Sequence, residues 1–149
     1  MLKYFALIVL IISSTLGINA QNQIYGFGWN EFGQLGDGTT ISKNTATQIG
    51  NSNEWLTISA GTTFSLGIKT DGTLWGWGDN SSGQLGDGTT IEKIIPTQIG
   101  TDTNWRTVSC GAAHSIAIKT NGTLWGWGDN SSGQIGDGTS QNRLTPTQI

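Results

Sequence analysis

Apolar and polar residues alternate over short stretches of this chain. Residues 73–78 read TLWGWG, so a strand there places Trp75 and Trp77 on one face and a leucine with two glycines on the other. Residues 105–109 and 114–119 also have the length and composition of short strands. No segment sustains the 3.6-residue period of a helix, so the pattern predicts an all-β protein.

Turn signals separate the expected strands. Asn121-Gly122 joins two apolar runs as a tight hairpin, and Asp71-Gly72 takes the same place earlier in the chain. Residues 80–83 (NSSG) and 86–88 (GDG) mark further turns. About four short strands are expected per 50 residues, which is the size of one four-stranded blade of a β-propeller.

The chain repeats itself with a period of 50 residues. Gln34, Gln84 and Gln134 coincide when the sequence is displaced by this amount, as do the Gly-Asp-Gly-Thr runs that begin at positions 36, 86 and 136. The repeats cover about residues 23–72, 73–122 and 123–149, the last of them partial. About two and a half repeats of this kind predict a β-propeller whose ring is incomplete.

Seven tryptophans and 23 glycines give the repeat its character. We expect the strand glycines to let a neighbouring sheet approach closely. We interpret Trp75, Trp77 and their equivalents as core, because Tyr25 and Phe27 replace them in the first repeat. Trp29 stands at a turn and is expected to be the most exposed ring; stacking of such rings on sugars is the alternative.

The first 20 residues have the layout of a secretory signal peptide. Lys3 precedes an apolar run over residues 5–17, and Ala20 offers a small residue at the cut. The run is shorter than the ~20 residues of a membrane-spanning helix, so no membrane span is expected. We predict cleavage after Ala20, a repeat domain over residues 21–149, and a secreted or cell-surface location.

Composition and charge exclude several classes of partner. Charged residues make up 11% of the chain and the net charge is −3, so no basic patch is expected to bind nucleic acid. Cys110 is the single cysteine, and Ala60 replaces it one repeat earlier, which indicates a small buried slot. His114, the single histidine, replaces Phe64 and is expected to be a packed core side chain.

The glycine-rich runs do not predict a nucleotide or catalytic site. They lack the Lys-Ser/Thr of a phosphate loop, and the turn at residues 79–84 lacks the ligand spacing of a usual calcium loop. Asx turns account for its aspartate and asparagine, although calcium binding is left open at this stage. The sequence predicts no enzyme, no cofactor and no metal site.

Several motifs at fixed offsets carry a family resemblance. They are Trp-Gly-x-Asn-x-x-Gly-Gln-Leu-Gly-x-Gly at residues 77–88, Pro-Thr-x-Ile at 96–99 and Gly-Ala-Ala-His-Ser at 111–115. Together they resemble the repeat of the regulator of chromosome condensation (RCC1) family, including its secreted bacterial members, over residues 21–149. The resemblance implies a β-propeller that has seven blades in the family, more than this chain holds.

The resemblance also implies several candidate functions for this chain. Some family members bind proteins through loop-lined faces, and nuclear members stimulate guanine-nucleotide exchange on a small GTPase. We expect an exported, non-catalytic module that binds an unidentified protein through loops between strands. A carbohydrate-binding or adhesin-like module that contacts a cell-surface glycan is the alternative, and nucleotide exchange comes third. Self-association or further repeats are expected to complete the ring.

Differences between the repeats locate the expected binding loops. The motifs Trp-Gly-Trp-Gly and Gly-Gln-Leu/Ile-Gly-Asp-Gly hardly vary between repeats, whereas residues 41–46, 91–96 and 140–145 differ from one repeat to the next. Such variation usually maps to loops on the binding face of a stacked array. The charged residues predicted to contact the partner are Lys43, Glu92, Lys93 and Arg143.

Overall fold

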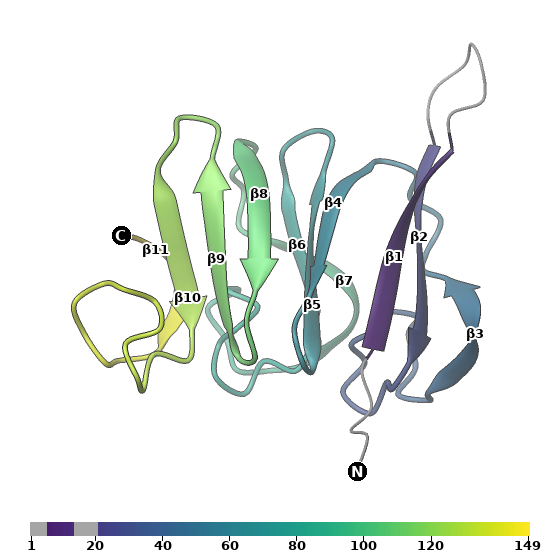
Figure 1. The fold of residues 1–149 in the computed structure, drawn as a ribbon, viewed down its shortest axis with the longest axis horizontal. Coiled ribbons are helices and arrows are strands. Elements are labelled where there is room, and N and C mark those ends of the chain that lie inside the picture. Colours follow the sequence, from purple (N-terminus) through teal and green to yellow (C-terminus); the bar gives the residue numbers. More distant parts are fainter. Residues whose placement is uncertain (1–5, 14–20) are drawn as a thin grey trace.

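The computed structural model describes residues 6–13 and 21–149, and every regular element within them is a β-strand. Three antiparallel sheets stand side by side along the long axis of the molecule (Figure 1). The first sheet contains, in spatial order, β1 (Ala6–Ser13), β2 (Gln21–Gly28) and β3 (Lys43–Gln48). The second contains β4 (Trp55–Ala60), β5 (Phe64–Lys69), β6 (Leu74–Gly78) and β7 (Lys93–Ile99). The third contains β8 (Trp105–Cys110), β9 (His114–Lys119), β10 (Leu124–Gly128) and β11 (Arg143–Gln148), so the all-β prediction is confirmed.

The boundaries of the sequence repeats and the boundaries of the sheets differ by two strands. The repeat at about residues 23–72 supplies β2 and β3 to the first sheet and β4 and β5 to the second. The next repeat joins the second sheet to the third in the same way. Each full repeat is therefore a covalent bridge between two sheets. No described residue belongs to a helix that could cross a membrane.

The apolar segment predicted as the core of a leader forms a strand of the first sheet. β1 pairs with β2 from Ala6 opposite Gly28 to Ser13 opposite Gln21. β5 holds the same place beside β6, where Phe64 lies opposite Gly78. The predicted cut after Ala20 lies outside the described residues and stays a prediction.

A buried tryptophan fastens each sheet to the one before it. Trp127 on β10 is fully buried, and its Nε1 donates a hydrogen bond to the carbonyl of Gln84 in the second sheet (2.9 Å). A Cβ on Gly86 would lie 2.7 Å from that Nε1, so glycine is needed for this approach. Trp77 lies as close to Gly36 in the loop of the first sheet, where a Cβ would be 2.8 Å from the indole, but its Nε1 is buried without a hydrogen-bond partner among the described residues.

Gly76 serves a different purpose from the one expected of the strand glycines. A Cβ on Gly76 would meet Leu66, Leu85 and Ile99, which belong to its own sheet or to the loop of that sheet. The space beside it is therefore filled from within the sheet. Close approach between sheets depends on loop glycines such as Gly86, and among the strand glycines on Gly128, where a Cβ would lie 3.1 Å from the backbone of Gln84 in the loop of the second sheet. The sequence interpretation is therefore wrong for Gly76 but holds for Gly128.

Four of the seven tryptophans are buried, as the sequence predicts for Trp77 and Trp127. Trp55, Trp77, Trp105 and Trp127 are buried, and Trp55 and Trp77 meet edge to face with centroids 5.6 Å apart. Of the other rings interpreted as core, Trp75 and Trp125 pack against it but are only partly buried, and Tyr25 and Phe27 are half-buried. Trp29 was expected to be the most exposed ring. It is half-buried and not fully exposed, because its ring lies edge-on against Phe32 with centroids 5.4 Å apart.

Candidate functional site

A buried asparagine organises the long loop that follows the inner strands of each repeat. The Nδ2 of Asn80 donates to Asp87 Oδ1 (2.9 Å) and to the carbonyl of Thr89 (3.0 Å). The backbone N–H of Leu85 donates to Asn80 Oδ1 (3.0 Å). Asn30 and Asn130 make the same contacts in their own repeats. The loop is therefore fixed from within, and its outer residues are presented on a rigid base.

Three of the four charged residues predicted to bind a partner form ion pairs within this loop. The pairs are Lys43–Asp37 (2.9 Å), Lys93–Asp87 (3.1 Å) and Arg143–Asp137 (2.6 Å). Glu92 lies exposed beside Lys93. An acid followed six residues later by a base, in all three repeats, was the signal in the sequence for these pairs. Their contribution to partner binding stays a prediction.

The aspartates of these pairs are held in the ionised form. Partial burial raises the pKa of Asp87, but hydrogen bonds from Thr89, Lys93 and Asn80 outweigh it and leave the pKa below the ordinary value of 3.8. The pKa of Asp37 is lowered in the same way. Hydrogen bonds from Thr139, followed by one from Arg143, hold the pKa of Asp137 well below its usual range. The loop network is therefore fully charged at neutral pH.

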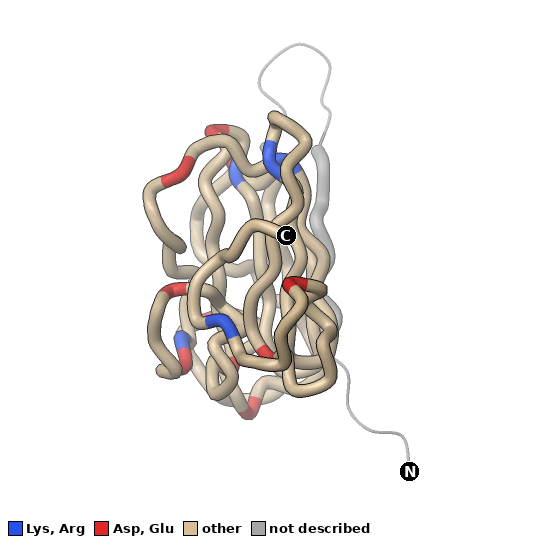
Figure 2. Tube along the Cα trace, turned by 90° about the vertical axis from the view of Figure 1, so that its left-hand side faces the viewer, with Lys and Arg blue, Asp and Glu red and all other residues tan. Residues whose placement is uncertain are grey.

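A row of exposed isoleucines lies on what we call the rim, residues 38–46, 88–96 and 138–146. Ile41, Ile91 and Ile95 are 67%, 64% and 56% exposed. Neighbouring rim segments are joined by backbone hydrogen bonds, from the N–H of Gly38 to the carbonyl of Ile94 (3.0 Å) and at the equivalent place one repeat later. Charged residues of both signs lie near the two ends of the strands (Figure 2). The rim thus combines apolar side chains with flanking charges.

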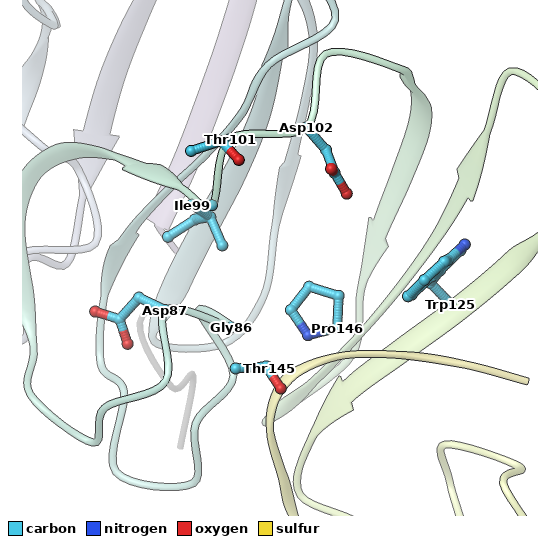
Figure 3. Close-up of a pocket in the computed structure, with 9 residues that line it drawn as sticks. Gly86, Asp87, Ile99, Thr101, Asp102, Trp125, Thr145 and Pro146 are labelled. Atoms are coloured by element: carbon cyan, nitrogen blue, oxygen red, sulfur yellow. The ribbon is translucent and has the colours of Figure 1, made fainter.

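A pocket of about 340 Å³ opens between the second and third sheets. Figure 3 shows its walls: the end of β7 and the segment after it, the residues of the Gly-Asp-Gly turn, and side chains from β10 and β11. They include Ile99, Asp102, Trp125, Thr145 and Pro146. Nothing in the repeat pattern predicted this pocket, because its walls come from two repeats that meet only in the folded chain.

A lysine fixes the tryptophan wall of the pocket. The Nζ of Lys119 lies 4.0 Å from the ring centroid of Trp125 and 4.6 Å from that of Trp105, and it is 2.6 Å from Asp102 Oδ2. The indole Nε1 of Trp125 donates to Thr123 Oγ1 (2.8 Å). Both contacts hold the ring in one orientation.

Cys110 and His114 are both less buried than predicted. Cys110 is half-buried and Ala60, at the same place in the second sheet, is exposed, so the position is not the small buried slot that the sequence indicates. Burial raises the pKa of the Cys110 thiol to about 12, so the thiol stays protonated at neutral pH, and its Sγ donates to the carbonyl of Ser59 (3.3 Å). His114 was expected to be a packed core side chain but is half-buried, whereas Phe64 at the same place in the second sheet is fully buried. The difference arises because no sheet among the described residues covers that side of the third sheet.

Three stacked antiparallel sheets, joined by repeats that bridge from one sheet to the next, define part of a repeat-built β-propeller. A family model described as the regulator of chromosome condensation (RCC1) repeat matches residues 21–68, 71–118 and 121–149. A second model with the same description matches residues 56–84 and 105–134. The chain belongs to this family.

Solved structures show the same architecture. Prp20p from Saccharomyces cerevisiae, described with its binding to Gsp1p and histones, is 25% identical with a TM-score of 0.75, over 86% of this chain and 34% of that one. Yeast RCC1 (Prp20) bound to Kap60 is 23% identical with a TM-score of 0.78, over 86% of this chain and 33% of that one. The chain thus spans about a third of the length of these propellers. A comparison with curated protein sequences finds no match.

Proposed function

We propose that this chain is a non-catalytic protein-interaction module whose partner binds across the rim. The exposed side chains of Ile41, Ile91 and Ile95 carry the proposal, because they stand on two rim segments that a backbone hydrogen bond joins, and aliphatic side chains in water favour burial against another molecule. The asparagine networks beneath the row reduce the ordering cost of binding. The binding of Prp20p to proteins supports protein recognition in general, without assigning its partners to this chain.

The charged residues of the rim have a secondary role in this proposal. Glu92 is exposed between the apolar row and Lys93, and Lys43 and Arg143 hold the same position as Lys93 in the other repeats. Rim charges of this kind mainly affect the rate of association and the choice of partner. A charge reversal at Glu92 is therefore expected to change the association rate and its salt dependence more than the melting temperature.

The test is a quantitative capture experiment from the organism's own extracellular fraction. An Ile41→Ser/Ile91→Ser/Ile95→Ser variant is compared with wild type and with Leu56→Ser, which removes an exposed leucine on β4, away from the rim. We expect one specific protein to be captured by wild type and Leu56→Ser and lost with the triple variant at equal melting temperature. Capture of the same protein by all three variants would contradict the proposal.

We further propose that the chain is exported, with residues 1–20 removed. The positive charge at Lys3, the apolar run and Ala20 support this. Cleavage would also remove β1, so the edge of β2 that now pairs with it would open. Intact-mass analysis of the exported protein is expected to give Gln21 as the first residue, and an exported protein that still begins at Met1 would refute the proposal.

A further inference from the structure

We propose that the pocket between the second and third sheets binds one neutral sugar ring. The inference goes beyond the protein-binding rim. Thr145 and Pro146 belong to both, but the other lining residues lie outside the rim, and the pocket has its own chemistry. Its volume of about 340 Å³ lies at the small end of the range of about 300–1,000 Å³ for small-molecule sites. That size suits one ring rather than a long chain.

The charges around the pocket favour a neutral ligand. Asp87 pairs with Lys93 (3.1 Å) and Asp102 pairs with Lys119 (2.6 Å), so each carboxylate that lines the pocket already has a cationic partner. A metal ion or an ammonium group would have to displace a lysine. An anion would lie beside two carboxylates. A ligand that offers hydroxyl groups meets neither difficulty.

The lining offers hydroxyl partners and apolar surface together. Within the described part of the chain, no hydrogen bond engages the hydroxyls of Thr101 and Thr145 or the Oδ1 of Asp102, and all three residues are exposed. Ile99, Pro146 and Trp125 supply the apolar walls. A sugar ring has C–H groups on its faces and hydroxyl groups around its edge, so it can use both kinds of surface at once.

The orientation of Trp125 supports a preformed site. Its Nε1 is bonded to Thr123 Oγ1, and Lys119 lies over the ring, so the indole needs no rearrangement when a ligand enters. Figure 3 shows Trp125, Asp102, Pro146 and Thr145 around a common space. Preorganisation of this kind lowers the cost of binding.

The first junction provides a matched comparison inside the same molecule. Displaced by 50 residues, Thr101, Asp102 and Thr145 become Asn51, Ser52 and Ile95, while the tryptophan and proline become Trp75 and Pro96. The aromatic wall is therefore repeated, whereas the carboxylate of Asp102 and the hydroxyl of Thr145 are not, because Ser52 and Ile95 stand in their places. Binding is expected at the second junction and not at the first.

The test uses the whole chain and four probes: the methyl glycosides of glucose, galactose, mannose and N-acetylglucosamine. Indole N–H signals are followed by NMR during titration. At least one glycoside is expected to shift the Trp125 signal saturably, with a dissociation constant of about 1–10 mM as befits a single small ring, and to leave Trp75 unchanged. No saturable shift of Trp125 with any probe up to about 100 mM would overturn the proposal.

A double variant locates the effect. Thr101→Asn/Asp102→Ser installs the residues of the first junction, which this fold already accommodates, and is expected to weaken binding at least tenfold. Asn51→Ala/Ser52→Ala is the control and should bind as wild type does. Equal affinity in wild type and the Thr101/Asp102 variant, or loss of binding in the control alone, would place the ligand elsewhere and refute the site.

Discussion

At the scale of the residue, the loops depend on one buried amide per repeat. Asn80 is fully buried, and its side chain bonds a half-buried carboxylate, a half-buried carbonyl and the fully buried backbone N–H of Leu85. Sequence reasoning recognised this position as part of a turn but not as the centre of a network. The amide's partners lie five to eleven residues further along, and only the folded loop brings them together.

Replacing Asn80 with alanine is expected to lower the free energy of unfolding by about 2–4 kcal/mol. The Leu85 N–H would lose its partner while fully buried, at a cost of about 1–3 kcal/mol. The half-buried Asp87 carboxylate and Thr89 carbonyl would each lose a hydrogen bond worth about 0.5–1.5 kcal/mol. Denaturant unfolding measures the loss. Asn121→Ala, at an exposed turn, is the control and should lose less than about 1 kcal/mol. Similar losses in both variants would show that the buried network contributes little.

The aspartates of the ion pairs predict a loss of stability in acid. Because the pKa of Asp87 is lower in the folded state than its ordinary value of 3.8, its stabilising effect is complete above that value and is lost as the pH falls through the folded pKa. The melting temperature should therefore fall as the pH drops below about 4. The Asp87→Asn variant should have a lower melting temperature than wild type at neutral pH. Its melting temperature should also fall less steeply as the pH drops. If the melting temperature of this variant fell with pH as steeply as that of wild type, Asp87 would not contribute to the loss of stability in acid.

At the scale of the element, each sheet is held to its predecessor by a tryptophan seated on a loop glycine. Trp127→Ala is expected to cost about 3–5 kcal/mol, because it opens a cavity at the junction. Trp127→Phe should cost less, since Phe27 fills this place in the first repeat. Thermal unfolding compares the two. A larger loss for phenylalanine than for alanine would mean that the ring strains the junction instead of filling it.

The strands and their hairpins could be predicted from the sequence, whereas their assignment to sheets could not. The alternation at residues 73–78 and the turns at Gly72 and Gly122 locate β6 and β10 correctly. A period of 50 residues, however, is the same wherever a repeat is taken to begin, so it does not reveal that β4 and β5 belong to the next sheet. The pocket and the Lys119–Asp102 pair were missed because they depend on contacts between sheets.

At the scale of the whole molecule, one side of the second sheet is covered by the third sheet. The same side of the third sheet has no further sheet against it among the described residues. Leu74 is fully buried, while Leu124 at the same place in the third sheet is 38% exposed. A Cβ on Gly83 would touch Leu144, whereas nothing lies within 4 Å of one on Gly133. The third sheet thus presents a surface shaped to receive another repeat.

Residues 21–149 on their own are expected to self-associate or aggregate through this surface. Leu124→Glu should shift sedimentation toward the monomer, because it places a charge where apolar contact is expected. Leu56→Glu, at an exposed position on β4, is the control and should leave association unchanged. A monodisperse wild-type monomer with a cooperative melting transition would contradict the prediction.

The two-strand offset between repeat and sheet has a consequence for how such arrays change length. A duplication of any 150 consecutive in-frame nucleotides within the uninterrupted array adds one sheet, because the new repeat supplies two strands to each side of a junction. The tryptophan and the loop glycine that meet at existing junctions meet again at the new one, whatever the starting codon. Unequal recombination can therefore lengthen or shorten the array without creating an unfamiliar contact between sheets.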